Sequence, residues 1–314
     1  MDIGWHVARD GVHLRLARWR APRAAGAERP QRGTALLLNG RAEFVEKYAE
    51  TAADLVARGF DVLSMDWRGQ GLSDRLTDHP ERGHLDSVDD LIADLDEVVE
   101  AETGGRQTAA GPVIVLAHSM GGHVALRWLA EHPGKAALAV LVAPMVLVAL
   151  PGAARAPAAT AAPISALARR AVRQGWDRRY ALGQRDYRPG RWGFRNNLLT
   201  GDPQRFDVHR RHFDESPALR LGGVTWGWLD AAYRSSRILT QPAYLRRIRV
   251  PVLICQAGRE VLVSNPAQRQ LAALLPHGRL TVYRDSFHEI LMERDEIRSA
   301  FWADFDTFLA DHGI

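Results

Sequence analysis

Short apolar runs alternate along the chain with segments whose apolar residues recur every three or four positions. The apolar runs predict strands at residues 34–38, 60–66, 113–117, 138–143, 251–256 and 279–283. The periodic segments predict helices at residues 44–58, 86–102, 120–131, 266–275 and 295–310. Alternating strands and helices with continuously apolar strands indicate a mainly parallel sheet with helices on both faces. Residues 12–19 predict a further, antiparallel strand at one edge.

The alternation stops between residues 145 and 249. This segment opens with an Ala- and Pro-rich stretch and continues with helical segments rich in Arg and Trp. We therefore predict an α/β core built from two parts, residues 1–144 and 250–314. Residues 145–249 are predicted to form a helical cap, or lid, inserted between two strands of that core.

Composition places the chain among ordinary globular proteins. Its 314 residues are 46% hydrophobic and 25% charged, which excludes disordered and fibrous classes. The single cysteine, Cys255, lies in an apolar strand, so an internal disulfide and a cysteine-based metal site are excluded. The first residues carry charges and no apolar signal segment, and the longest apolar run, 136–150, is short and contains Pro144. A cytoplasmic protein is expected.

The small net charge of +4 conceals an uneven distribution. Residues 151–250 hold nineteen Arg, no Lys and seven acidic residues, about +12, which leaves about −8 elsewhere. These arginines, with Trp176, Trp192, Trp226 and Trp228, suit phosphate headgroups or an anionic membrane surface. The alternative is a set of solvated helix faces in a chain that uses Arg in place of Lys. No nucleic-acid motif accompanies them, so nucleic acid is not an expected partner.

The candidate nucleophile is Ser119. It lies in the segment 117–122, AHSMGG, directly after a predicted strand and directly before a predicted helix. Such a turn exposes the serine hydroxyl at the carboxyl edge of a sheet, and Gly121 and Gly122 allow the backbones to approach closely. The helix N-terminus favours negative charge that develops there. The alternative role for Ser119 is that of a simple helix cap.

A nucleophilic serine needs a base that is oriented by an acid. His288 follows the last predicted strand and is the candidate base. Glu260 follows the preceding strand and is the candidate acid, with Asp285 as a weaker rival. The backbone N–H groups of Met120 and Arg41 are the candidate oxyanion donors.

The glycine-rich segment 66–73 is expected to brace the loop that carries Arg41. It superficially resembles a phosphate-binding loop but lacks the lysine and the following helix. Nucleotide binding is therefore not predicted. We expect neither a metal ion nor an organic cofactor in the reaction.

Together these motifs point to a family. Residues 39–43 (NGRAE), 66–71 (DWRGQG), 83–84 (GH), 117–122 (AHSMGG) and 288–289 (HE) resemble the lysophospholipase/monoacylglycerol lipase family of α/β-hydrolases, and most closely its bacterial lysophospholipase L2 type. The resemblance implies an α/β-hydrolase fold with Ser119 as nucleophile, His288 as base and Glu260 at the acid position. It also implies the Arg41 and Met120 amides as oxyanion donors.

Ala117 stands for the first glycine of the general Gly-x-Ser-x-Gly pattern, as in the lysophospholipase L2 type. The chain departs from the family at two positions, with Asn39 for a histidine and Glu260 for an aspartate. The expected activity is hydrolysis of carboxylic esters of lipids through a Ser-His-Glu triad. Within that activity, the expected enzyme is a lysophospholipase. Alternatives are a monoacylglycerol lipase, a general carboxylesterase, a peptidase of the same fold, or an inactive binding protein. Expected partners are a lipid or small ester and, peripherally, the inner face of an anionic membrane.

Overall fold

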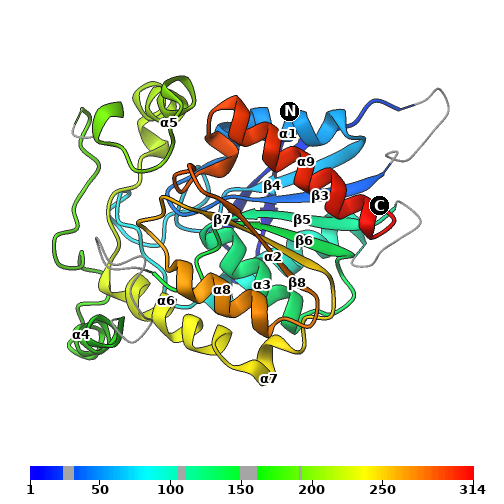
Figure 1. Ribbon diagram of the computed structural model, residues 1–314. Helices are drawn as coiled ribbons and strands as arrows, with labels where there is room; N and C mark the ends of the chain where they lie inside the picture. Colours follow the sequence, from blue (N-terminus) through cyan, green and yellow to red (C-terminus); the bar gives the residue numbers. More distant parts are fainter. Residues whose placement is uncertain (24–31, 105–110, 149–160, 191–192) are drawn as a thin grey trace.

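The computed structural model describes residues 1–23, 32–104, 111–148, 161–190 and 193–314. These residues form one eight-stranded sheet in the order β1-β2-β4-β3-β5-β6-β7-β8 (Figure 1). The strands are β1 (Asp2–Val7), β2 (His13–Trp19), β3 (Gly33–Leu38), β4 (Phe60–Met65), β5 (Val113–His118), β6 (Leu138–Val142), β7 (Val252–Ala257) and β8 (Gly278–Tyr283). The six strands from β3 to β8 are parallel, which confirms the predicted fold class.

The N-terminal edge of the sheet differs from the prediction. Residues 12–19 do form an antiparallel strand, β2, but it lies between β1 and β4 and is not at the edge. The edge strand is β1, which the apolar pattern missed. Its side chains are exposed or half-buried, with Ile3, Trp5 and Val7 open to solvent, so no continuous apolar run marks it.

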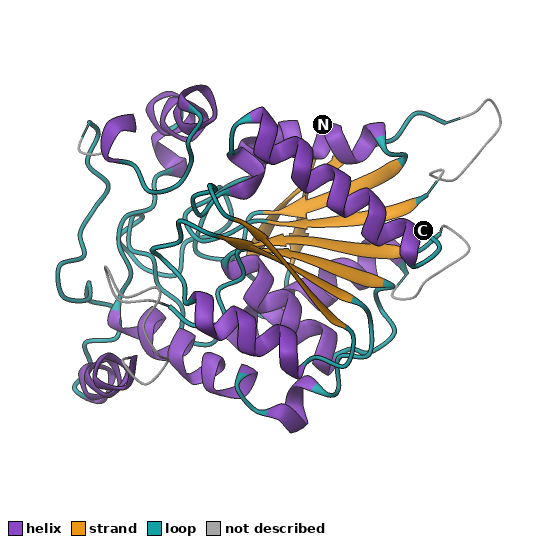
Figure 2. Cartoon of the chain, in the orientation of Figure 1, coloured by secondary structure: helices purple, strands orange, loops and turns teal. Residues whose placement is uncertain are grey.

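Helices cover both faces of the sheet (Figures 1 and 2). One face carries α1 (Ala49–Ala57) and α9 (Asp295–Asp311); the other carries α2 (Val88–Thr103), α3 (Met120–Glu131) and α8 (Asn265–Leu274). The helix predicted at 44–58 is wrong at its start, because a 3-10 turn at Val45–Tyr48 precedes α1. Short 3-10 turns also occur at Phe194–Asn196, Pro217–Leu219 and Ile290–Met292.

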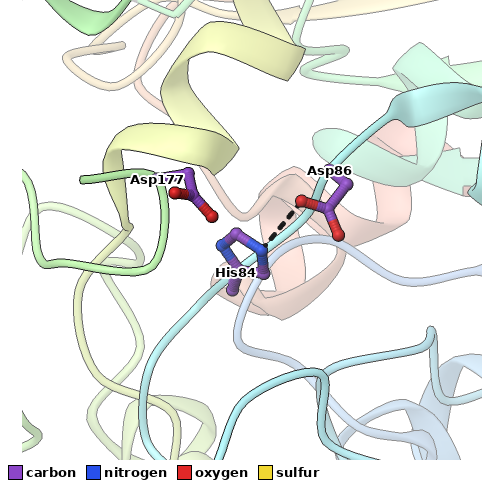
Figure 3. A group of neighbouring side chains, drawn as sticks. All are labelled: His84, Asp86 and Asp177. Carbon is purple, nitrogen blue, oxygen red and sulfur yellow. Dashed lines mark hydrogen bonds and ion pairs between the residues drawn. The ribbon is translucent and has the colours of Figure 1, made fainter. Parts of the chain in front are cut away.

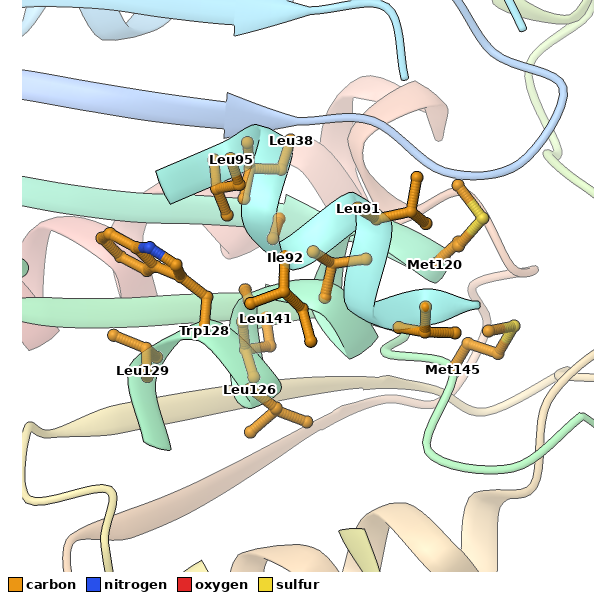
Figure 4. Close-up of a cluster of buried hydrophobic side chains, with 14 of the residues drawn as sticks. Leu38, Leu91, Ile92, Leu95, Met120, Leu126, Trp128, Leu129, Leu141 and Met145 are labelled. Atoms are coloured by element: carbon orange, nitrogen blue, oxygen red, sulfur yellow. The ribbon is translucent and has the colours of Figure 1, made fainter. Parts of the chain in front are cut away.

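A buried apolar cluster fixes α3 against the sheet (Figure 4). Leu91, Ile92 and Leu95 of α2 meet Trp128 and other side chains of α3 over the strands. Met120 and Met145 close the cluster at the carboxyl end of the sheet. Because α3 is held by close packing along its length, the residue that precedes it, Ser119, is held in place as well.

The insertion after β6 supplies α4 (Ala162–Arg173), α5 (Pro203–Glu215), α6 (Trp226–Leu239) and α7 (Pro242–Leu245). In Figure 1, α4 and α5 lie at the left, beyond the carboxyl ends of the parallel strands. By contrast, α6 packs on the core: the Ser235 hydroxyl lies 2.7 Å from Nε2 of His123 and 2.6 Å from Nη1 of Arg127. No helix among the described residues is long and apolar enough to cross a membrane.

Candidate active site

Ser119 lies on the tight turn between β5 and α3. Its φ of 51° is in the left-handed region, which a residue with a side chain adopts only when its surroundings hold it there. The Ser119 N–H donates to the Val142 carbonyl at 3.0 Å, and the Ser119 carbonyl accepts from the Met145 N–H at 2.9 Å. The turn is thus fixed by β6 and by the segment that follows it.

The glycines that follow Ser119 are required by close backbone contacts. A Cβ on Gly121 would lie 2.5 Å from the Leu38 carbonyl oxygen, and one on Gly122 would lie 2.9 Å from Cβ of Pro144. Ala117, at the position of the first glycine in the usual pattern, is fully buried within β5. The turn therefore accommodates the methyl group of Ala117, two residues before the serine, but has no room for a methyl group at Gly121.

The structure brings together the three residues that the sequence proposed as nucleophile, base and acid. The Ser119 Oγ lies 3.0 Å from Nε2 of His288, and Nδ1 of His288 lies 2.7 Å from Oε2 of Glu260. The other carboxylate oxygen of Glu260 accepts the N–H groups of Val261 at 2.9 Å and Leu262 at 2.8 Å. The rival acid, Asp285, is exposed.

Glu260 and His288 are neighbours because the loops after β7 and β8 pair with each other. The Gly258 N–H donates to the Tyr283 carbonyl at 2.8 Å, and the Arg259 N–H donates to the Ser286 carbonyl at 2.9 Å. A Cβ on Gly258 would lie 2.2 Å from the Arg284 carbonyl oxygen, so only glycine permits this approach. This contact fixes where the loop that carries Glu260 lies.

Burial and charge set the protonation states of the pair. Burial raises the pKa of Glu260, but the adjacent His288 and the backbone N–H groups lower it more, so that it lies below its ordinary value. Burial lowers the pKa of His288, and the Glu260 carboxylate more than offsets this, so that it lies above 6.5. An ionised Glu260 accepts the Nδ1–H of His288, which leaves Nε2 as the acceptor that faces Ser119.

The loop that carries Arg41 passes directly over Ser119. A Cβ on Gly40 would lie 3.2 Å from Cβ of Ser119. The Gly40 N–H binds the Glu43 carboxylate, and the Ala42 N–H binds Oε1 of Gln70 at 3.2 Å. Within the described ranges, the N–H groups of Arg41 and Met120 have no acceptor. Both remain open to a ligand.

The segment after β4 braces this loop, as predicted. Trp67 Nε1 donates to the Asn39 carbonyl at 2.9 Å, and Gln70 Nε2 donates to the Gly40 carbonyl at 2.9 Å. Asn39 itself, which replaces the usual histidine, donates from Nδ2 to the Met65 carbonyl at 3.0 Å. The asparagine therefore ties the loop to the end of β4.

A buried charged cluster beside the serine was not predicted from the sequence. The Lys47 ammonium lies 2.7 Å from carboxylate oxygens of both Glu43 and Glu289, and the Tyr48 hydroxyl donates to Glu43 at 2.7 Å. Burial raises the pKa of Glu43, but Lys47 and His118 lower it more, to about 2. Glu289 follows His288 and Glu43 binds the Gly40 N–H, so the cluster joins the base loop to the loop over the serine. The available signal was Lys47, one of two lysines in the chain.

His84, Asp86 and Asp177 form a second polar group (Figure 3). Their potential ligand atoms lie within 4.8 Å of one another. However, Nε2 of His84 already binds Asp86 at 3.1 Å, and Nδ1 binds the Thr225 hydroxyl at 2.9 Å. A metal ion would have to break one of these bonds. Through the Thr225 hydroxyl, the group instead links the segment before α2 to the residue that precedes α6.

Comparisons with known proteins agree with this fold. A family model described as serine aminopeptidase, S33, matches residues 29–295. The chain is 33% identical over 306 residues to lysophospholipase L2 of Escherichia coli K12, covering 92% of this chain and 82% of that protein. It is 32% identical over 274 residues to a probable lysophospholipase L2 of Haemophilus influenzae, covering 87% and 82%.

Solved structures share the architecture at low identity. A monoglyceride lipase from Saccharomyces cerevisiae superposes with a TM-score of 0.71 at 17% identity, covering 99% of this chain and 96% of that one. A carboxyl esterase from Bacillus coagulans superposes with a TM-score of 0.75 at 15% identity, covering 100% and 99%. At such identities these matches establish the fold alone. The family match and the two relatives establish more: this chain belongs to the serine aminopeptidase S33 family of α/β-hydrolases.

Proposed function

We propose that this protein is a serine hydrolase that cleaves carboxylic esters of lipids, and specifically a lysophospholipase. The observation that carries the proposal is the hydrogen-bonded chain of Ser119, His288 and Glu260. Oγ of Ser119 lies 3.0 Å from Nε2 of His288, and Nδ1 of His288 lies 2.7 Å from Oε2 of Glu260. Two relatives at 32% and 33% identity, named as lysophospholipases, support the substrate class. The intact hydrogen-bonded chain argues against an inactive binding protein.

Each group has a defined step in the proposed reaction. Nε2 of His288 takes the Ser119 proton as Oγ attacks the ester carbonyl, and Glu260 stabilises the imidazolium that forms. The N–H groups of Arg41 and Met120 bind the oxyanion. His288 then protonates the leaving alcohol, and water, activated by the same histidine, hydrolyses the acyl-enzyme.

A substrate panel tests the proposal with the unmodified protein. We expect hydrolysis of lysophosphatidylcholine, with slower turnover of a monoacylglycerol and a short aryl ester, and no turnover of an aminoacyl anilide. Mass spectrometry after treatment with a fluorophosphonate should locate the label on Ser119. Turnover of the anilide alone would identify a peptidase, and absence of both turnover and label would support the binding-protein alternative.

We also propose that the cap contacts an anionic membrane surface. Its exposed large apolar residues among the described positions are Leu167, Trp176, Leu182, Phe194 and Leu198. Three arginines, Arg169, Arg170 and Arg173, lie on α4 beside the first of them. Trp228 is buried and takes no part, and Trp192 lies outside the described residues.

Vesicle sedimentation tests this contact. We expect binding to phosphatidylglycerol vesicles that falls at least about tenfold when salt is raised from about 0.05 to 0.5 M, because screening weakens surface attraction. Phosphatidylcholine vesicles serve as the neutral control. Equal binding to both kinds of vesicle, or none to either, would contradict an electrostatic membrane contact.

A further inference from the structure

The side chain of Arg41 lies in a pocket next to the proposed oxyanion site. The pocket is lined by Arg41, Met120, Gln70, Leu221 and Trp228 among others; its cavity volume is about 10 Å³, room for about one water molecule, and it opens to solvent on one side. Nη1 of Arg41 donates to the Gly222 carbonyl at 3.0 Å, and its guanidinium carbon lies 5.9 Å from the Trp228 ring centroid. The remaining guanidinium nitrogens make no hydrogen bond within the described part of the chain.

Backbone pairing makes room for this guanidinium. Gly83 and Gly223 are joined by an N–H···O bond of 3.0 Å, which brings the segment before α2 against the segment before α6. A Cβ on Gly83 would lie 2.8 Å from Nη1 of Arg41. The absence of a side chain at Gly83 therefore lets the arginine extend along the pocket wall and bind the Gly222 carbonyl.

The charge of Arg41 has no counter-ion in the described ranges, where no carboxylate lies within ion-pairing distance of it. Arg68 lines the same pocket but is neutralised by Asp94 at 2.6 Å and Asp10 at 2.7 Å. Burial lowers the pKa of Arg41 to about 10, so the group is still a cation at neutral pH. A half-buried cation without a counter-ion is unfavourable, and an anionic ligand relieves that cost.

The position of Arg41 relative to Ser119 suggests which anion binds. Its backbone follows Gly40, which lies against Ser119, and its side chain shares the pocket with Met120. In a lysophospholipid, a glycerol backbone separates the acyl ester from a phosphodiester. When the Arg41 and Met120 N–H groups bind the ester carbonyl, the phosphodiester is one glycerol backbone away from them, and the Arg41 guanidinium lines the adjoining pocket.

We propose that the Arg41 guanidinium binds the phosphodiester of the substrate headgroup and so selects lysophospholipids over neutral monoacylglycerols. This inference rests on the proposed ester hydrolysis at Ser119 and adds the headgroup to it. A guanidinium suits phosphate because it offers several N–H donors in one plane to two oxygens. The same charge repels an ammonium group, such as the N-terminus of a peptide.

Selectivity between two substrates with the same acyl chain tests the proposal. For Arg41→Gln, we expect the ratio of kcat/KM for lysophosphatidylcholine to kcat/KM for the monoacylglycerol to fall about ten- to a hundredfold, the effect of one charged hydrogen-bond pair. Arg41→Lys should retain part of the ratio. An unchanged ratio in Arg41→Gln would overturn the proposal.

Arg75 provides a matched control. It also binds carbonyls of the insertion, with Nη2 2.5 Å from the Ala218 oxygen, but it does not line the pocket. Arg75→Gln should therefore leave the selectivity ratio unchanged. If Arg75→Gln and Arg41→Gln lower the ratio equally, the arginines act by holding the insertion and the headgroup site is wrong.

A binding measurement separates this inference from the proposed reaction. Ser119→Ala, alone and combined with Arg41→Gln, is titrated calorimetrically with an ether-linked lysophosphatidylcholine, which cannot be hydrolysed. We expect at least about tenfold weaker binding of this ether in the double variant and equal binding of an ether-linked alkylglycerol by both. Binding of inorganic phosphate alone, with no preference between the two ethers, would indicate a free-phosphate site. If the unmodified protein hydrolyses no ester but the variants show this difference in ether binding, the proposed reaction is refuted and the headgroup site is not.

Discussion

Ser119→Ala is expected to reduce kcat for ester hydrolysis by about a millionfold, the size of effect seen when a triad nucleophile is removed. The alanine removes the hydroxyl oxygen that lies 3.0 Å from Nε2 of His288, so no acyl-enzyme can form. Labelling by a fluorophosphonate should disappear together with turnover. Any remaining hydrolysis would come from water held by the oxyanion donors and the substrate pocket.

The fold should survive this substitution. Alanine keeps the backbone bonds that hold the turn, from the Ser119 N–H to Val142 and from Met145 to the Ser119 carbonyl. Ser64→Ala is the matched control, because Ser64 is also buried, lies on β4 and has no hydrogen-bond partner for its hydroxyl within the described residues. Both variants should have nearly the wild-type Tm, and only Ser119→Ala should be inactive. Retained turnover in Ser119→Ala would refute the assigned nucleophile.

The sheet was predictable because its parallel strands are buried on both faces and read as apolar runs. The pattern failed at β1, where one side of the chain faces solvent and Trp5 and Val7 stand exposed. It also failed at the start of α1, where the Val45 N–H binds the Asp66 carboxylate, which follows β4. A contact with a distant loop thus decided the local conformation.

The proposed site was predictable to the extent that chain order determines it. In a parallel sheet, the loops after β5, β7 and β8 all open at the same edge, so Ser119, Glu260 and His288 could be proposed from their positions alone. The distances between their side chains could not be predicted, because they depend on the close approach of Gly258 to the Arg284 carbonyl.

Side chains that meet across long sequence separations give no local signal of which partner they contact. The Lys47–Glu289 pair joins residues 242 positions apart. Lys47 lies in the helix predicted at 44–58, and Glu289 was named only as part of the 288–289 motif, without a role of its own. Arg41 was proposed for its backbone N–H only, because the environment of its side chain depends on the insertion near Gly222. The environment of the Trp228 side chain was not predictable either: the composition suggested a surface residue, but Trp228 packs in the core.

Lys47→Met is expected to lower the free energy of unfolding by about 3–5 kcal/mol, the range for breaking a buried ion pair by removal of one partner. The ammonium lies 2.7 Å from both Glu43 and Glu289, and all three side chains are almost fully buried. Methionine fills a similar volume but leaves two carboxylates enclosed without a cation. Urea unfolding followed by circular dichroism measures the change.

The chain contains its own control for this experiment. Lys135, the other lysine, binds Asp96 at 2.6 Å and Glu100 at 3.3 Å in two ion pairs that are partly exposed to water. Because exposed pairs contribute little, Lys135→Met should lower the free energy of unfolding by no more than about 1 kcal/mol. In the double variant Lys47→Met/Glu289→Gln, a neutral amide replaces one of the two carboxylates left without a cation. Part of the lost free energy of unfolding should therefore be recovered. Equal effects of the two lysine variants would mean that the cluster beside Ser119 contributes no more than a surface pair.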